Sequence, residues 1–227
     1  MPSTRKMLHF LGGTLASAIA VGMLGYGMST DWAEMKMMCA EQGTDLYNGT
    51  AEVTLGLFWL TIARNCPYFA VENSYTVFEK LQEVGGPPVI LHGLVITFIV
   101  LSLVSTACSI LISLYNSVSN PYQTHLGPVG VFTCSAFSVV LCFLAIILFV
   151  VNVCATDMSE QLVKNELLMN LKDLGVTMKI GFFFLLPFLV LSLLAILVIF
   201  LYQHAAYTHQ QEQQRPTEDA PKEIMMY

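Results

Sequence analysis

Ionisable residues are scarce in this chain. Only 11% of its 227 residues are Asp, Glu, Lys or Arg, whereas 55% are hydrophobic. A typical soluble domain carries about 25% charged residues, most of them on the surface that faces water. The scarcity therefore excludes an ordinary soluble protein and indicates that lipid is the main solvent of the chain.

Four long stretches contain no Asp, Glu, Lys or Arg at all. They are residues 7–28, 89–115, 129–153 and 180–202. A bilayer core about 30 Å thick is crossed by roughly 20 mainly apolar helical residues, and a charge at its centre costs about 2.5 to 3.5 kcal/mol on insertion scales. Each stretch meets both conditions. The predicted fold class is an all-α membrane protein, a bundle of four transmembrane helices with a small β-containing extracellular subdomain.

These helices define the predicted organisation of the chain. We predict a cytoplasmic N-terminus at 1–6, transmembrane helices at 7–29, 89–115, 129–153 and 180–202, extracellular loops at 30–88 and 154–179, a cytoplasmic loop at 116–128 and a cytoplasmic tail at 203–227.

Clustered basic residues and buried charges are also missing. Beyond Arg5 and Lys6 no two basic residues are adjacent, which excludes a basic stripe for nucleic acid. Pumps and most transporters place ionisable groups at membrane depth, where the main candidate here is His92 near the outer edge of its helix. We interpret His92 as a hydrogen-bonded surface group without a role. With no nucleophile and base pair, metal cluster or phosphate loop, we predict no enzyme activity and no cofactor.

The orientation rests on three observations that agree. Arg5 and Lys6 precede the first helix and favour a cytoplasmic N-terminus. The sequon that begins at Asn48 can be glycosylated only on the lumenal side, and the two cysteines of the same loop favour that oxidising side as well. We therefore expect a plasma-membrane protein with both termini cytoplasmic. Six of the ten Lys and Arg residues count against this, because they would lie outside. A cleaved signal peptide is the alternative, although the first apolar run is longer than a typical signal core.

The first outer loop has the composition of a small ordered subdomain. Residues 51–63 are rich in β-branched and aromatic side chains and predict a strand, and a helix is expected from Asn73 onward with Val77, Leu81 and Val84 on one stripe. Cys39 and Cys66 are the two cysteines of the loop. We predict that they form a disulfide; two free thiols, or a pairing with Cys154, are the alternatives.

In the second outer loop, apolar residues at helical spacing between Leu162 and Leu174 predict an amphipathic helix that Gly175 terminates.

Small residues repeat at every fourth position of the first helix, a pattern that indicates close packing within the bundle. Pro187 predicts a kink in the fourth helix.

The tail 203–227 is rich in Gln, Glu and Pro and is predicted to be disordered. Its last residues include Met225 and Tyr227 at the third-last and last positions. Apolar residues at these two positions fit strand addition to a PDZ domain.

Three groups of residues form a distinctive combination: Trp32 after the first helix, Leu55-Gly56-Leu57-Phe58, and above all the inner-loop run from Tyr115 to Thr124 with Leu126-Gly127-Pro128. In these residues the chain resembles the clarin family of tetraspan membrane proteins. Clarins are in turn similar to claudins and calcium-channel gamma subunits, where Trp and Gly-Leu-Trp elements correspond to Trp32 and Gly56-Leu57-Phe58. The close cysteine pair that follows Gly-Leu-Trp in that group is represented here only by Cys66, which places a claudin-style hairpin disulfide in doubt.

The resemblance implies a non-enzymatic membrane organiser or auxiliary subunit, linked in the family to sensory-cell membranes, synapses and the actin cytoskeleton. The partners expected are membrane lipid, other membrane proteins through lateral helix packing, and a PDZ-type scaffold or cytoskeletal adaptor at the tail. Two alternatives are an oligomeric channel or transport protein and a claudin-like adhesion protein.

Overall fold

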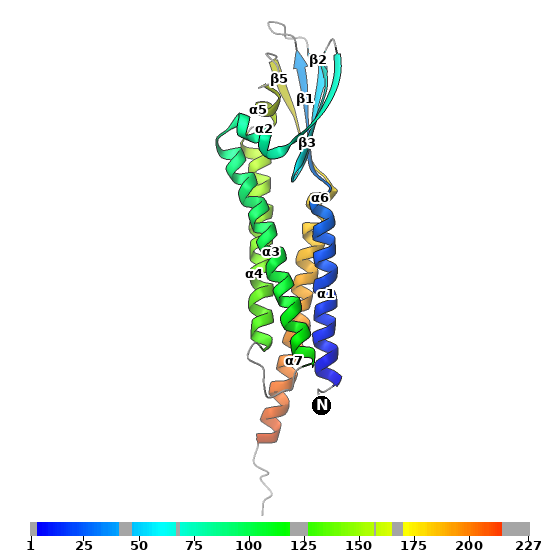
Figure 1. The fold of residues 1–227 in the computed structure, drawn as a ribbon, viewed down its shortest axis with the longest axis vertical. Coiled ribbons are helices and arrows are strands. Elements are labelled where there is room, and N and C mark those ends of the chain that lie inside the picture. Colours follow the sequence, from blue (N-terminus) through cyan, green and yellow to red (C-terminus); the bar gives the residue numbers. More distant parts are fainter. Residues whose placement is uncertain are drawn as a thin grey trace, which may run out of the picture.

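A computed structural model gives the fold, and it describes residues 4–40, 47–66, 69–118, 127–156, 158–164 and 170–214. The described elements are α1 (Thr4–Met28), β1 (Asp31–Ala40), β2 (Tyr47–Gly56), β3 (Trp59–Cys66), β4 (Phe69–Thr76), α2 (Val77–Val84), α3 (Pro87–Val118), α4 (Pro128–Ala155), α5 (Met158–Lys164), β5 (Asn170–Met178), α6 (Ile180–Phe183) and α7 (Leu185–Gln214). Long helices form a bundle with the sheet at one end, and the N-terminus lies at the opposite end (Figure 1).

Within the described residues, four helical segments are long and apolar enough to cross a membrane: Lys6–Met28, Pro87–Val118, Pro128–Ala155 and Ile180–Ala205. Local sequence explains where two of them begin. Pro128 stands at the start of α4, where its missing N–H removes no helical hydrogen bond. Gly85 and Gly86 both adopt positive φ and separate α2 from α3. The predicted four-helix membrane fold with a small sheet is confirmed.

The fourth span is interrupted close to its beginning. α6 ends at Phe183 and α7 begins at Leu185, so that the break lies just before Pro187. A proline has no N–H to donate and its ring crowds the preceding turn, which explains an irregularity at this point. The kink expected at Pro187 therefore takes the form of a short separate helix.

The sheet is antiparallel with the strand order β4-β3-β2-β1-β5. The prediction of one strand over residues 51–63 is wrong, because the chain turns at Leu57 and Phe58 and makes the β2–β3 hairpin instead. The turn lies inside an apolar run and is not marked by the usual polar turn residues. The expected helix forms as α2, but it begins only at Val77 because Asn73 still belongs to β4.

The amphipathic helix expected in the second outer loop is also wrong over most of its length. Helix α5 ends at Lys164, and the chain from Asn170 to Met178 forms β5, which pairs with β1. Gly175 adopts a φ of 129° within this strand, beside a register shift between Lys36 and Met37, and does not terminate a helix. Tertiary pairing with the free edge of β1 here overrides the local helical spacing of the leucines.

The sheet and the bundle share one hydrophobic core. Apolar side chains from β1, β2 and β3 pack together with residues of α2, α5 and the adjoining ends of the long helices. Inside the bundle, α3 and α4 are joined by hydroxyl groups: Ser102 and Ser138 lie 2.8 Å apart, and Ser109 and Ser135 lie 2.7 Å apart. On α1, a Cβ at Gly13 would lie 3.2 Å from Cδ1 of Ile199, as expected for close packing inside the bundle.

Candidate functional site: the junction between the sheet and the bundle

Trp32 anchors the sheet to the helices. It follows α1 by four residues and has no exposed surface. Its indole Nε1–H donates a hydrogen bond of 2.8 Å to the carbonyl of Gly27, and its ring meets Phe149 edge-on at a centroid distance of 5.1 Å. A buried indole needs such an acceptor, and the end of α1 supplies a carbonyl that has no partner within the helix. Trp32 thereby connects α1, β1 and α4.

A glycine makes room for this tryptophan. A Cβ on Gly181 would lie 2.5 Å from Cδ1 of Trp32 and 2.7 Å from the carbonyl oxygen of Asp31. The backbone of α6 therefore approaches the start of β1 more closely than any larger residue permits. Beside this contact, the N–H of Lys179 donates a hydrogen bond of 2.8 Å to the carbonyl of Trp32. The fourth span is thus fixed to β1 next to Trp32.

The β2–β3 turn is attached to the second span by His92. Leu57 is buried, and its carbonyl lies 2.8 Å from Nε2 of His92 on α3. The next carbonyl, that of Phe58, accepts a hydrogen bond of 2.9 Å from the N–H of Val77 at the start of α2. The prediction that His92 is a surface group is wrong, since its side chain is completely buried. An apolar helix carries no sequence signal for a buried imidazole that binds a turn 35 residues earlier.

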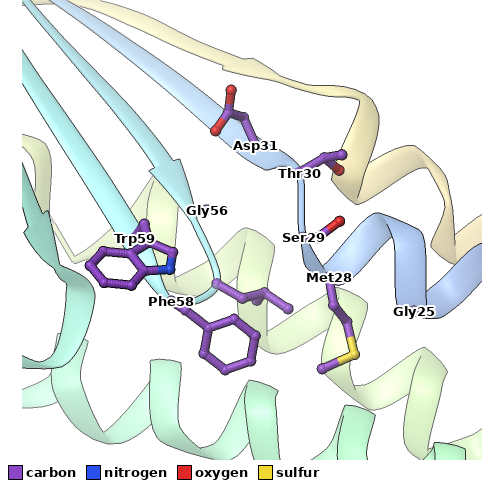
Figure 2. Close-up of a pocket in the computed structure, with 9 residues that line it drawn as sticks. Gly25, Met28, Ser29, Thr30, Asp31, Gly56, Phe58 and Trp59 are labelled. Carbon is purple, nitrogen blue, oxygen red and sulfur yellow. The ribbon is translucent and has the colours of Figure 1, made fainter.

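A cavity of about 370 Å³ opens at this junction. Figure 2 shows it between the end of α1 and the β2–β3 turn. The residues that line it are Gly25, Met28, Ser29, Thr30, Asp31, Gly56, Leu57, Phe58 and Trp59. Phe58 and Trp59 are 41% and 67% exposed, so their rings lie at the surface although they belong to a firmly held turn.

A buried carboxylate fastens β5 to the sheet. Glu34 on β1 is only 6% exposed, and its side chain forms ion pairs with Lys36 at 2.7 Å and with Lys179. Two neighbouring cations stabilise the ionised form of a carboxylate that has lost most of its water. Sequence reasoning missed this group, because Lys179 comes from a segment 145 residues after Glu34.

The predicted Cys39–Cys66 disulfide is present and leaves Cys154 as a free, exposed thiol. It joins β1 to the end of β3 across the intervening strand β2, with the two Cα atoms 5.9 Å apart. Gly49 of β2 lies beneath it: a Cβ there would overlap the Cys39 sulfur and lie 2.8 Å from Cα of Cys66. The bridge therefore spans three strands and is not a hairpin disulfide.

Comparison with known proteins places the chain. The family model described as Clarin-2-like matches residues 5–171. Clarin-3 of Mus musculus is 33% identical over 232 residues that cover both chains completely, and Clarin-3 of Homo sapiens is 33% identical over 235 residues with the same coverage. Clarin-1 of Homo sapiens is 27% identical over 170 residues, which is 71% of this chain and 72% of that protein. The chain belongs to the clarin family.

In this clarin two of the three groups of residues that carried the resemblance meet in space, whereas most of the inner-loop run, residues 119–126, lies outside the described residues. Trp32 occupies the centre of the junction, and Gly56, Leu57 and Phe58 form the neighbouring turn. Asn48 lies on β2 near the disulfide, with an exposed side chain. Met225 and Tyr227, predicted as a PDZ ligand, lie outside the described residues. The prediction that the tail is disordered from residue 203 is wrong for its first part, because α7 continues as a helix to Gln214. The described part of this clarin contains no group of three or more His, Cys, Asp or Glu residues that could hold a metal ion.

Proposed function

We propose that this clarin is a non-enzymatic plasma-membrane organiser or auxiliary subunit that docks laterally against another membrane protein. In the proposed orientation the sheet is extracellular and both termini are cytoplasmic. The tail, which ends with Met225 and Tyr227, binds a PDZ-type scaffold or cytoskeletal adaptor.

The observation that carries the proposal is the rigid attachment of the sheet to the bundle. β1 continues from α1 through Trp32, β5 leads into α6 through Lys179, and His92 holds the β2–β3 turn to α3. Packed interfaces of this kind have discrete arrangements and transmit displacement. A partner that contacts the sheet would thus also bias the helices, as an auxiliary subunit requires.

The bundle itself favours an organiser over a channel. Its four charge-free stretches contain no acidic or basic residue that could form a selectivity ring. The hydroxyl groups between α3 and α4 bind one another: Ser138 contacts Ser102 at 2.8 Å and Thr106 at 2.7 Å. Hydroxyls that are satisfied in this way stabilise a closed helix pair and offer no continuous polar path.

The flanks of the helices leave ample surface for lateral contact. Only 28% to 33% of the most hydropathic stretch of each span is buried within the chain. The remainder faces lipid or the helices of another protein. Since lipid gives no hydrophobic drive for association, recognition there depends on shape and small residues, and the sheet adds a second surface beyond the membrane.

Affinity purification from a mild detergent tests the proposal. An N-terminal tag keeps the C-terminus free for its ligand. We expect a membrane protein to be recovered in stoichiometric amount, and a variant lacking the last three residues should keep that protein while losing any cytoplasmic scaffold. A pure monomer recovered from several expressing tissues would contradict an organiser, and currents from the purified protein in liposomes would instead support a channel.

A further inference from the structure

We propose that the cavity at the junction binds the choline headgroup of a phospholipid from the leaflet next to the sheet. The cavity lies between the end of α1 and the β2–β3 turn (Figure 2). The apolar span of α1 ends at Met28, and the lining runs from Gly25 to Asp31 on this side. The cavity therefore crosses the level at which lipid headgroups meet the ends of membrane helices.

The lining combines one negative charge with aromatic rings. Asp31 is the one ionisable residue among the nine that form the cavity, and its side chain makes no ion pair within the described chain. Phe58 and Trp59 lie below Asp31 in the view of Figure 2 and are both exposed. A cavity that is lined by a carboxylate and by aromatic rings suits a quaternary ammonium group, which is attracted by both and donates no hydrogen bond.

The two hydroxyl groups of the cavity strengthen this preference. Ser29 donates its hydroxyl hydrogen to the carbonyl of Tyr26 at 2.7 Å, and Thr30 donates its own to the carbonyl of Gly27 at 3.0 Å. Each hydroxyl group thus retains only lone pairs for a ligand. Oxygen lone pairs and a carboxylate attract a cation and repel an anionic headgroup, and no Lys or Arg lines the cavity to reverse this.

The apolar wall fits the remainder of such a lipid. Met28 is half-buried and Leu57 is buried, and both lie on the cavity with the Phe58 ring. A choline group held near Asp31 would leave the glycerol and the first methylenes of the acyl chains beside these side chains. A sterol could use the same hydroxyl oxygens without needing the carboxylate, so dependence on Asp31 separates the two ligands.

Tryptophan fluorescence in nanodiscs provides the test. The chain has two tryptophans, of which Trp32 is buried and Trp59 lines the cavity. Nanodiscs of phosphatidylglycerol would receive the same small fraction of either phosphatidylcholine or phosphatidylglycerol, brominated on the acyl chains close to the headgroup. A Trp59→Phe variant supplies the background from Trp32. We expect brominated phosphatidylcholine to be about two- to fivefold more effective as a quencher, the range of an exposed cation–π contact.

Asp31→Asn should remove the preference for the choline lipid, whereas Glu72→Gln should keep it. Glu72 is an exposed acid on β4, away from the cavity, so both variants change the net charge equally. If Asp31→Asn fails to fold, Phe58→Leu tests the contribution of the aromatic lining and should reduce the preference for phosphatidylcholine over phosphatidylglycerol. Equal quenching by both lipids in the native protein, or a preference that survives Asp31→Asn, would overturn the proposal.

The leaflet next to the sheet is the outer leaflet in the proposed orientation. The nanodisc experiment does not depend on that orientation, because both leaflets of a nanodisc have the same composition. A negative result would therefore reject the lipid site and leave the proposed function untouched, and a reversed orientation would change only the leaflet that supplies the lipid.

Discussion

The sheet and the bundle are stabilised by different kinds of interaction. The sheet contains a disulfide, a carboxylate paired with two lysines, and alternating apolar residues that pack on one face. The bundle contains small residues at helix contacts and hydroxyl groups that bind one another across α3 and α4. Unlike the sheet, the membrane-spanning stretches 7–28, 89–115, 129–153 and 180–202 contain no Asp, Glu, Lys or Arg that could form an ion pair.

The difference follows from the surrounding medium. Beside water, burying apolar surface is favourable and a small sheet still needs a covalent bridge because its core is small. Within lipid that drive is absent, and association depends on packing and on hydrogen bonds whose donors find no water. The junction at Trp32 lies between these two media, and there a single buried, hydrogen-bonded aromatic side chain joins the sheet to the bundle.

Removing the junction should have the largest effect. Trp32→Ala deletes a fully buried aromatic side chain and should lower the free energy of unfolding by about 3 to 5 kcal/mol. We also expect the sheet to lose its attachment and to unfold before the bundle. Thermal unfolding in nanodiscs, followed by protease sensitivity of the sheet and by helical circular dichroism, measures both effects. Trp59→Ala is the control, and a single coincident transition in Trp32→Ala would contradict the role given to Trp32.

Breaking the disulfide should affect the sheet alone. Cys39→Ser opens a bridge between residues 27 apart, which corresponds to about 3 to 4 kcal/mol on the chain-entropy model. Proteolysis of the sheet should accelerate while the helical signal of the bundle is unchanged. Cys154→Ser should alter neither, because that thiol is free and exposed. A loss of helical signal in Cys39→Ser would mean that the two regions are not separable.

Neutralising the buried carboxylate should weaken the sheet by a smaller amount. Glu34→Gln removes the charge that holds Lys36 and Lys179, at a loss of about 1 to 3 kcal/mol. The effect should appear as faster cleavage of β5, since Lys179 follows that strand directly. Glu52→Gln, a half-buried acid on β2, is the matched control. Equal rates of proteolytic cleavage of β5 in both variants would show that the Glu34 ion pairs do not stabilise the attachment of β5 to the sheet.

Removing one hydrogen bond inside the bundle should lower the free energy of unfolding by less than the Glu34→Gln change in the sheet. Ser138→Ala removes a hydroxyl that contacts Ser102 and Thr106, and interhelical hydrogen bonds in membranes contribute about 0.6 kcal/mol on average. Unfolding in mixed SDS micelles can resolve this difference. Thr133→Ala provides the comparison, because that hydroxyl bonds only within its own helix, to Val129. A loss as large as that for Glu34→Gln would contradict the contrast between the two media.

The smallest effect on stability is expected at the sequon. Asn48→Gln should abolish a glycosidase-sensitive mass shift and change the free energy of unfolding by less than about 0.5 kcal/mol, because the side chain is exposed. Thr50→Ala should have the same consequence by destroying the acceptor sequence. Absence of the shift from the unmutated protein made in mammalian cells would count against an extracellular sheet.

The membrane helices could be predicted because each depends on a local property, a run without charge. The disulfide could be predicted for a similar reason, since Cys39 and Cys66 are the two cysteines of one loop. The β2–β3 turn could not be predicted, because its glycine lies inside an apolar run that is equally compatible with one longer strand.

The remaining errors concern partners that are distant in sequence. β5 carries leucines at helical spacing, and only the free edge of β1 makes it a strand. His92 is buried because the Leu57 carbonyl lies opposite it, and Glu34 can be buried because Lys179 comes to it. The need for glycine at positions 49 and 181 could not be predicted for the same reason, since in each case the space for a Cβ is occupied by a residue from another segment.

The position of β5 at the edge of the sheet has a consequence for biosynthesis. β1 ends at Ala40, whereas β5 ends at Met178, 138 residues later. At translation rates of about 5 to 20 residues per second, the ribosome needs roughly 7 to 28 s to synthesise the intervening chain. During that interval two helices enter the bilayer while one edge of β1 has no partner strand. In the proposed orientation this open strand edge faces the endoplasmic reticulum lumen, where a chaperone has time to bind it.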